Sequence, residues 1–112
     1  MEITKGVIIA DNTRISSYSF ICELVSTGKN CYIAHGAMFT NDLFKNRKLA
    51  SSVENLFSTI IGDDVLIGTN STILPVNIVS GCVIGADSVF TRDCKIKGVY
   101  AGNPAKLLRK LD

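Results

Sequence analysis

The chain has 112 residues, enough for one domain and little else. Apolar residues make up 46% of it and charged residues 20%, which is typical of a globular chain and not of a disordered one. A net charge of +2 does not indicate nucleic-acid binding, no stretch is apolar enough for a membrane span, and the N-terminus lacks the apolar segment of a signal peptide, so we expect a cytoplasmic protein.

Residues that are nearly all apolar recur at every sixth position in the first third of the chain and divide it into six-residue units. The first residues of these units are Ile3, Ile9, Ile15, Ile21, Thr27, Ile33 and Phe39. Four positions further on, each six-residue unit has a small or β-branched residue, namely Val7, Thr13, Ser19, Val25, Cys31 and Ala37. A period of six fits neither the 3.6-residue turn of a helix nor an ordinary alternating strand.

This period is typical of a hexapeptide parallel β-helix, in which each unit forms one flat side of a three-sided prism. One coil of the prism takes roughly 18 residues, and coils stack at the strand spacing of about 4.8 Å. The first residue of each unit points inward, which favours isoleucine, and the fifth lies inside near a corner, where little space is left. Residues 1–39 are therefore predicted to form coils 1 and 2.

The period stops at residues 40–59, which we interpret as a loop that leaves the prism at one corner and returns to it. Insertions into a regular scaffold often carry function. Asn41 and Asp42 could hydrogen-bond a substrate or merely cap a turn. A basic cluster in the same loop (Lys45, Arg47 and Lys48) could pair with a nucleotide diphosphate, or it could be a solvated surface.

The period returns in residues 60–96, which are predicted to form coils 3 and 4. The first residues of the units are Ile61, Ile67, Ile73, Ile78, Ile84 and Phe90, and the small fifth residues are Val65, Ser71, Cys82, Ser88 and Cys94. Glycines follow three of the first residues, at Gly62, Gly68 and Gly85, where we expect the backbone to turn tightly. The unit between Ile73 and Ile78 is one residue short and contains Pro75, which indicates a local break in pairing.

Residues 97–112 form a tail of different character. The triplet Gly102, Asn103 and Pro104 indicates a turn, and residues 105–111 are predicted to form a short helix that covers the open end of the prism or a neighbour. The small core of four coils and the unpaired edge of the first coil favour association, and three flat faces make a threefold arrangement natural.

The four cysteines are interpreted as small core residues in a reducing compartment. Cys31, Cys82 and Cys94 occupy the inward fifth position, and Cys22 follows a first residue. Because no two of them have the spacing Cys-x-x-Cys, neither a zinc knuckle nor a redox pair is indicated.

Residues 61–95, together with VYAGNPAKLLR at 99–109, resemble the left-handed parallel β-helix acyltransferases, which include galactoside, maltose and serine acetyltransferases. The resemblance covers nearly the whole chain. It implies an all-β, left-handed parallel β-helix in a single domain of about four hexapeptide coils. It also implies a homotrimer that uses acetyl-CoA and no metal, with acetyl-CoA bound in a groove between adjacent prisms.

Three segments look like a narrower group within that family. IAHGAMFTNDLF (33–44), IGTNSTILPVNI (67–78) and KGVYAGNPAKLLR (97–109) are similar to bacterial N-acetyltransferases that act on dTDP-linked 3-amino-3,6-dideoxyhexoses for S-layer and O-antigen glycans. Those enzymes usually have additional N-terminal coils, whereas this chain begins close to its histidine motif. This departure bears on the nucleotide-binding part of the substrate site.

His35 is the only histidine, and it occupies the third position of its unit, where side chains point outward. It is either an exposed turn residue or a general base near the cofactor sulfur, which would accept a proton as the acceptor attacks. A sugar amine is already nucleophilic and needs placement beside the thioester more than it needs a base. A hydroxyl acceptor would need the base far more.

The resemblance also implies contacts to acetyl-CoA. The matching positions for pantetheine are Thr69, which lines the groove, and Ala86, which supplies backbone hydrogen-bonding groups. Nearer the nucleotide the matching positions are Thr91 and Arg92, and those that meet the phosphates are Lys106 and Arg109. For each cation, a solvated surface charge is the alternative.

The function favoured by the sequence is acetyl transfer to the amine of a nucleotide-linked amino sugar for surface glycan synthesis. The alternatives are O-acetylation of a saccharide and a non-catalytic β-helix interaction module. The γ-class carbonic anhydrases share the prism but need three histidines around zinc, and this chain has one.

Overall fold

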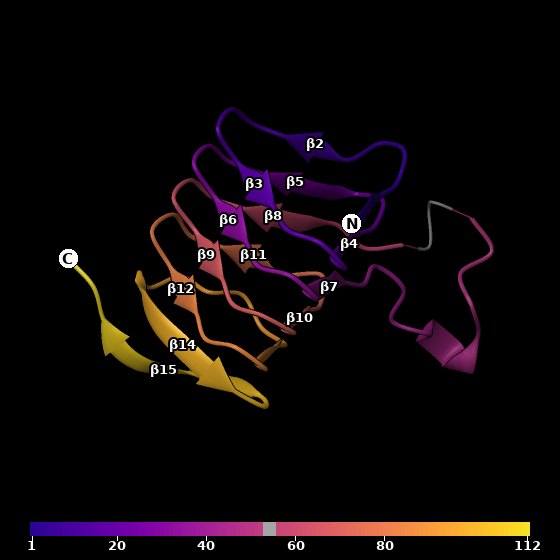
Figure 1. Cartoon of the computed structure of the whole chain (residues 1–112). Coiled ribbons are helices and arrows are strands. Elements are labelled where there is room, and N and C mark those ends of the chain that lie inside the picture. The colour runs from indigo at the N-terminus through magenta and orange to yellow at the C-terminus, as the bar shows by residue number, and fades with distance from the viewer. Residues whose placement is uncertain (53–55) are drawn as a thin grey trace.

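Very short strands stacked in a column make up most of the molecule (Figure 1). The computed structural model describes residues 1–52 and 56–112. The strands of the first face are, in spatial order, β1 (Glu2–Ile3), β4 (Phe20–Ile21), β7 (Met38–Phe39), β10 (Thr72–Ile73) and β13 (Val89–Phe90). Those of the second face are β2 (Ile8–Ile9), β5 (Val25–Thr27), β8 (Thr59–Ile61) and β11 (Asn77–Ile78). Those of the third face are β3 (Arg14–Ile15), β6 (Tyr32–Ile33), β9 (Leu66–Ile67), β12 (Val83–Ile84), β14 (Gly98–Gly102) and β15 (Ala105–Lys110).

The chain visits the three faces in turn, so each group of three strands makes one coil of a parallel β-helix. Neighbouring strands on a face are parallel, and the first residues of successive units lie in register, as in the pair Ile33 and Ile67 and the pair Ile67 and Ile84. The predicted fold class is confirmed. A fifth coil follows the four expected ones, because β13, a bridge between Cys94 and Ile78, and β14 continue the three faces.

The inward positions build the core as the six-residue period predicts. Ile21, Ile33, Ile67, Ile73 and Ile84 are at most 1% exposed. Burying one such side chain contributes about 1.5–3 kcal/mol. Ile3 in coil 1 is 42% exposed, because β1, β2 and β3 are the terminal strands of their sheets and no coil covers them from that side.

The corners of the prism are formed by residues with left-handed backbone conformation. The residue three positions after the first residue of a unit has a positive φ throughout most of the column; these residues are Gly6, Asn12, Tyr18, Leu24, Asn30, Gly36, Asp64, Asn70, Gly81 and Asp87. Glycine, asparagine and aspartate tolerate this region best, which explains why they are frequent there.

The glycines that directly follow the first residues have a role in the spacing of the coils. Gly62, Gly68 and Gly85 are not among the residues with positive φ, so these positions do not require the left-handed freedom of glycine. A Cβ atom on Gly62 would lie 2.6 Å from the backbone nitrogen of Ser80, and one on Gly68 would lie 2.6 Å from that of Ala86. These glycines are therefore needed because the next coil approaches closely.

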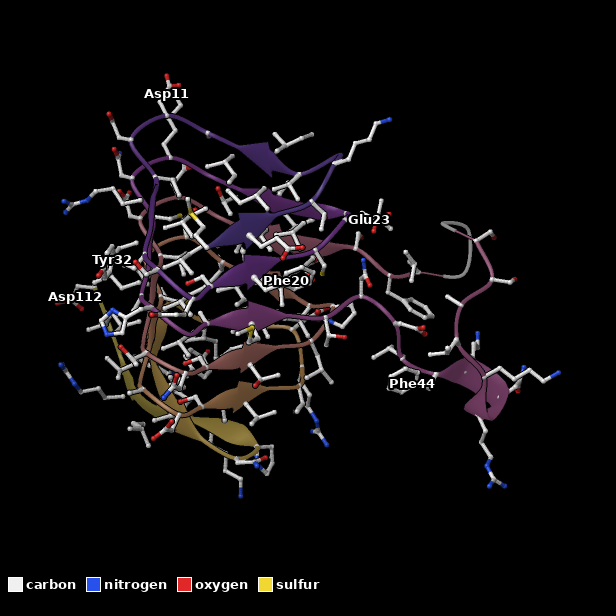
Figure 2. All side chains as sticks on the ribbon, turned by 45° about the vertical axis from the view of Figure 1, so that its right-hand side comes forward. Asp11, Phe20, Glu23, Tyr32, Phe44 and Asp112 are labelled. Atoms are coloured by element: carbon white, nitrogen blue, oxygen red, sulfur yellow. The ribbon has the colours of Figure 1, made fainter. Side chains whose placement is uncertain are left out.

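The predicted loop leaves the column between β7 and β8 and is called the excursion (residues 40–52 and 56–58). It contains one short 3₁₀ turn, η1 (Lys45–Arg47), which lies away from the stacked strands (Figure 1). Its base is closed by a hydrogen bond from the Phe57 amide to the Asn41 carbonyl of 2.9 Å. Figure 2 shows Phe44 on the excursion, away from the column, and Glu23 near the place where the excursion joins it.

The predicted C-terminal helix is wrong. Residues 105–110 form β15, which pairs antiparallel with β14 along the outer edge of the third face. A helix of seven residues is marginal in water unless it buries an apolar face. Leu108 is 64% exposed and Leu107 37%, so a helix would have gained little, whereas β15 satisfies the backbone groups of an otherwise open strand edge. No helix in the described ranges is long and apolar enough to cross a membrane.

All four cysteines lie in the core with free thiols, as expected. Burial raises the pKa of Cys22 to about 11 and that of Cys82 to about 12. The sulfur atoms of Cys82 and Cys94 lie 3.0 Å apart. Because a thiolate is the reactive form, these raised pKa values make Cys22 and Cys82 inert at neutral pH.

Thr59 is expected to be a site where a valine stabilises the fold. Its hydroxyl is buried and has no hydrogen-bond partner among the described residues, which costs free energy. Thr59→Val keeps the shape and removes the unpaired group, so we expect the free energy of unfolding to rise by about 1 kcal/mol. Urea unfolding measures it.

The matched control is Ser19→Ala, because the buried Ser19 hydroxyl donates to the Ala34 carbonyl at 2.9 Å. This change should lower the stability by about 1 kcal/mol. A Thr59→Val variant that is no more stable than the parent would contradict the prediction.

Candidate active site

The corner between the third and first faces brings three predicted site residues together. His35, Thr69 and Ala86 occupy equivalent positions in coils 2, 3 and 4, as the register of β6, β9 and β12 shows. Hydrogen bonds join the levels: the Asn70 amide donates to the His35 carbonyl at 3.2 Å, and the Asp87 amide donates to the Thr69 carbonyl at 2.8 Å. We call residues 16–19, 34–37, 68–71 and 85–88 the histidine corner.

Two glycines allow the coils to approach each other closely at the histidine corner. Gly36, directly after His35, has a φ of 77°, and a Cβ atom there would collide with the side chain of Asn70. Gly68 lies against the backbone of Ala86 in the next coil. The backbone of His35 is thereby held on a rigid scaffold while its side chain is exposed to solvent.

The segment that contains β14 adds one more coil at the histidine corner. Tyr100 pairs with Ile84, so Gly102 lies in register below Ala86, and the Gly102 amide donates to the Ser88 hydroxyl at 3.3 Å. On β15, Lys106 pairs with Ala101 beside this corner, whereas Arg109 pairs with Val99 further along the third face. Both cations are exposed.

Thr91 and Arg92 lie at another corner. They follow β13, whereas Ala86 precedes it, so the two groups lie at opposite ends of one strand of the first face. Both residues are exposed. Their corner is the one from which the excursion leaves the column, and β13 between them is the terminal strand of its sheet.

Asn41 and Asp42 hold the base of the excursion. The Asn41 side-chain amide donates to the Glu23 carbonyl at 2.9 Å. The two carboxylate oxygens of Asp42 accept from the amides of Phe44 at 2.9 Å and Ala50 at 2.8 Å. Both residues therefore organise the loop, and their predicted contact with a substrate would have to use lone pairs and protons left over from these bonds.

The excursion encloses a pocket of about 360 Å³. Its lining includes Lys45, Lys48 and Phe57, and the Lys45 ammonium lies 5.9 Å from the centre of the Phe57 ring. Two of the three cations of the predicted basic cluster thus line one cavity, together with Asp42. No group of three or more His, Cys, Asp or Glu residues that could hold a metal ion occurs within residues 1–52 and 56–112.

The sequence interpretation missed Tyr18. It lies at the histidine corner in coil 1, with a φ of 62° and with 81% of its surface exposed. The signal was available, because Tyr18 occupies the position at which the corner otherwise has Gly36, Asn70 and Asp87.

Known proteins share both the repeat and the fold. The sequence family described as "Hexapeptide repeat of succinyl-transferase" matches residues 58–92. A probable macrolide acetyltransferase of Lysinibacillus sphaericus is 33% identical over 114 aligned positions, which cover 83% of this chain and 63% of the relative. The putative lipopolysaccharide biosynthesis O-acetyl transferase WbbJ of Escherichia coli K12 is 32% identical, with 95% of this chain and 62% of the relative covered.

Among solved structures, the hexapeptide-repeat-containing acetyltransferase VCA0836 of Vibrio cholerae superposes with a TM-score of 0.83 at 24% identity, over 96% of this chain and 64% of that one. This likeness supports the fold. The chain spans less than two thirds of the length of the two curated relatives.

Proposed function

We propose that the chain is a hexapeptide-repeat protein with a left-handed parallel β-helix that transfers an acetyl group from acetyl-CoA to a saccharide; the match to the hexapeptide-repeat family over residues 58–92 and the curated relatives named as acetyltransferases support this proposal. The observation that carries the proposal is the histidine corner. It stacks His35, Thr69 and Ala86 in successive coils, which are about 4.8 Å apart. The exposed imidazole of His35 thus lies next to two stacked positions, Thr69 and Ala86, along which the pantetheine arm of acetyl-CoA could bind.

His35 is the general base of the proposed reaction. Its exposed imidazole accepts the proton of the attacking hydroxyl as the new bond to the acetyl carbonyl forms and the thiolate of coenzyme A departs. Since the backbone of His35 is fixed by the close coils behind it, only the side-chain torsions of His35 have to be ordered before reaction.

Coils 4 and 5 offer polar and cationic groups that match the parts of acetyl-CoA. Beyond β13 the first face has no further strand among the described residues, so backbone groups are open to the amides of pantetheine. Exposed cations for the phosphates lie on both sides of this edge, namely Arg92 at one end of β13 and Lys106 and Arg109 on β15.

We also infer that three copies assemble, as the resemblance implies. Outward apolar side chains support an assembly through flat faces: Met38 on the first face is 44% exposed, and Leu66 on the third face is 45% exposed. The histidine corner lies where these two faces meet, so a neighbouring prism would stand beside it. The four free, buried thiols suit a cytoplasmic location, because that compartment is reducing.

A hydroxyl acceptor is favoured first. Such an acceptor needs a base, and the O-acetyl transferase WbbJ is among the relatives. The second candidate is the amine of a nucleotide-linked amino sugar, such as a dTDP-linked 3-amino-3,6-dideoxyhexose for surface glycans. The pocket with Lys45 and Lys48 favours it, because two cations in one cavity suit a diphosphate.

The test compares acceptors that differ in one group. The release of coenzyme A from acetyl-CoA is measured with methyl glycosides and with dTDP-linked sugars that carry either a hydroxyl or an amine at the same position. We expect release with a hydroxyl acceptor to exceed that with its amino counterpart. The reverse order would select the second candidate, and calorimetry that shows no binding of acetyl-CoA would leave the non-catalytic interaction module.

A further inference from the structure

Tyr18 has an unfavourable backbone conformation without compensation from packing. Its φ of 62° lies in the left-handed region, which is costly for a bulky side chain. Leu24 has a similar φ of 67° but is half-buried, so its side chain gains contacts. Tyr18 is 81% exposed, and its side chain makes no hydrogen bond or ring contact with any described residue. Strain of this kind at an exposed position points to a role in binding.

The position of Tyr18 is defined relative to His35. The Gly36 amide donates to the Ser17 carbonyl at 3.1 Å, so Ser17 and Tyr18 lie directly beside His35 and Gly36, one coil nearer the N-terminus. Thr69 and Ala86, proposed to meet the pantetheine arm, lie on the other side of His35. An acceptor that approaches the imidazole opposite the thioester therefore passes over the corner of coil 1.

The surroundings of Tyr18 are polar. The Ser16 hydroxyl lies 3.0 Å from the hydroxyl of Tyr32, and the Arg14 guanidinium lies 5.8 Å from the centre of the Tyr32 ring. The Tyr32 ring thus already has a partner, whereas that of Tyr18 has none in the described part of the chain. Figure 2 shows Tyr32 and Phe44 on opposite sides of the column, so this surface is separate from the pocket of the excursion.

We propose that Tyr18 is an acceptor-binding residue whose ring stacks on the apolar face of a pyranose ring at the histidine corner. An aromatic ring offers a large contact area at low entropic cost, and the phenolic hydroxyl can bond a sugar hydroxyl. The inference rests on the proposed function and deepens it, because it names a sugar ring as the part of the acceptor that is recognised. The Tyr18 ring is 81% exposed and is therefore available to a ligand.

The test uses two variants that relieve the same backbone conformation. Asparagine tolerates the left-handed region, so Tyr18→Asn and Leu24→Asn should each raise the Tm, by about 4 °C at Tyr18 and by less at Leu24, where packing is lost. Only Tyr18→Asn should raise the KM for the acceptor, by about tenfold, with the KM for acetyl-CoA unchanged. Tyr18→Phe should keep the acceptor KM within about threefold, because stacking is retained.

An unchanged acceptor KM in Tyr18→Asn would overturn the proposal. So would a loss of assembly in sedimentation equilibrium, which would place Tyr18 in a contact between protomers. A second measurement is independent of catalysis: methyl glycosides of glucose, galactose and mannose are added without acetyl-CoA, and saturation transfer from the aromatic protons of the protein is compared by NMR between the parent and Tyr18→Asn. Transfer that is present in the parent and lost in Tyr18→Asn supports Tyr18 even if acetyl transfer fails, and equal transfer in both proteins, or none with any of the three glycosides, contradicts it.

Discussion

The His35→Ala variant is expected to lose about a thousandfold in kcat with a hydroxyl acceptor, while the KM for acetyl-CoA stays unchanged. An alcohol is a poor nucleophile until its proton is removed, and His35 is the proposed base, beside the positions proposed for the thioester arm. With an amine acceptor the loss should be modest, about tenfold, because a neutral amine attacks without a base and the proton can leave afterwards.

Steady-state kinetics with the paired acceptors measures the effect, and thermal unfolding serves as the control. The His35 side chain is exposed and makes no hydrogen bond within the described residues, so the variant should unfold within about 0.5 kcal/mol of the parent. If kcat with the hydroxyl acceptor is unchanged, His35 has no part in the mechanism. A large loss with the amine as well would mean that His35 also positions the acceptor.

The Gly68→Ala variant is expected to destabilise the fold by about 3 kcal/mol, a large share of the stability of a small domain. The added Cβ atom would lie 2.6 Å from the Ala86 nitrogen and 2.8 Å from the Ile84 carbonyl oxygen. Both are backbone atoms, and the Gly68 amide donates to the same Ile84 carbonyl at 2.8 Å. Coils 3 and 4 would therefore have to separate at the level that joins Thr69 to Ala86.

Gly6→Ala is the matched control. A Cβ atom at Gly6 meets nothing within 4 Å, but the φ of 85° is unfavourable for alanine, so we expect a loss of about 1 kcal/mol. Urea unfolding of both variants gives the comparison. Equal losses would show that the backbone conformation, and not the spacing of the coils, decides what a glycine contributes.

The core was predictable because each inward residue depends only on its place in a unit. The burial of Ile67 and Ile84 could be predicted from their own six-residue units, without reference to the rest of the chain. The stacking of His35, Thr69 and Ala86 at one corner could not be predicted from the six-residue period in the same way. His35 and Thr69 are 34 residues apart and Thr69 and Ala86 are 17 residues apart, although all three occupy the same corner. The excursion lengthens one coil, and the short unit at Pro75 removes one residue from the next.

Features that depend on distant partners were predicted poorly. Residues 105–110 have a pattern that a helix could use, but the open edge of β14 decides in favour of a strand. For Asp42 the sequence left open a substrate contact and a turn cap; both of its oxygens accept bonds from the loop, as a cap does, and contact with a substrate remains a prediction. The place of Tyr18 in its unit was visible in the sequence, where the same corner otherwise has glycine, asparagine or aspartate, but its left-handed backbone and high exposure were seen only in the structure.

The exposed edge of coil 1 affects the order in which the coils unfold on warming. Stacked repeats melt from the side with the fewest neighbours, and within the described residues β1, β2 and β3 have a coil on one side only. Fraying there would disturb Tyr18 while leaving the edge below Ala86 intact, since β14 and β15 cover the third face at the far end. When a protein made of these residues is warmed, the proposed binding of the sugar should therefore be lost at a lower temperature than the proposed binding of coenzyme A.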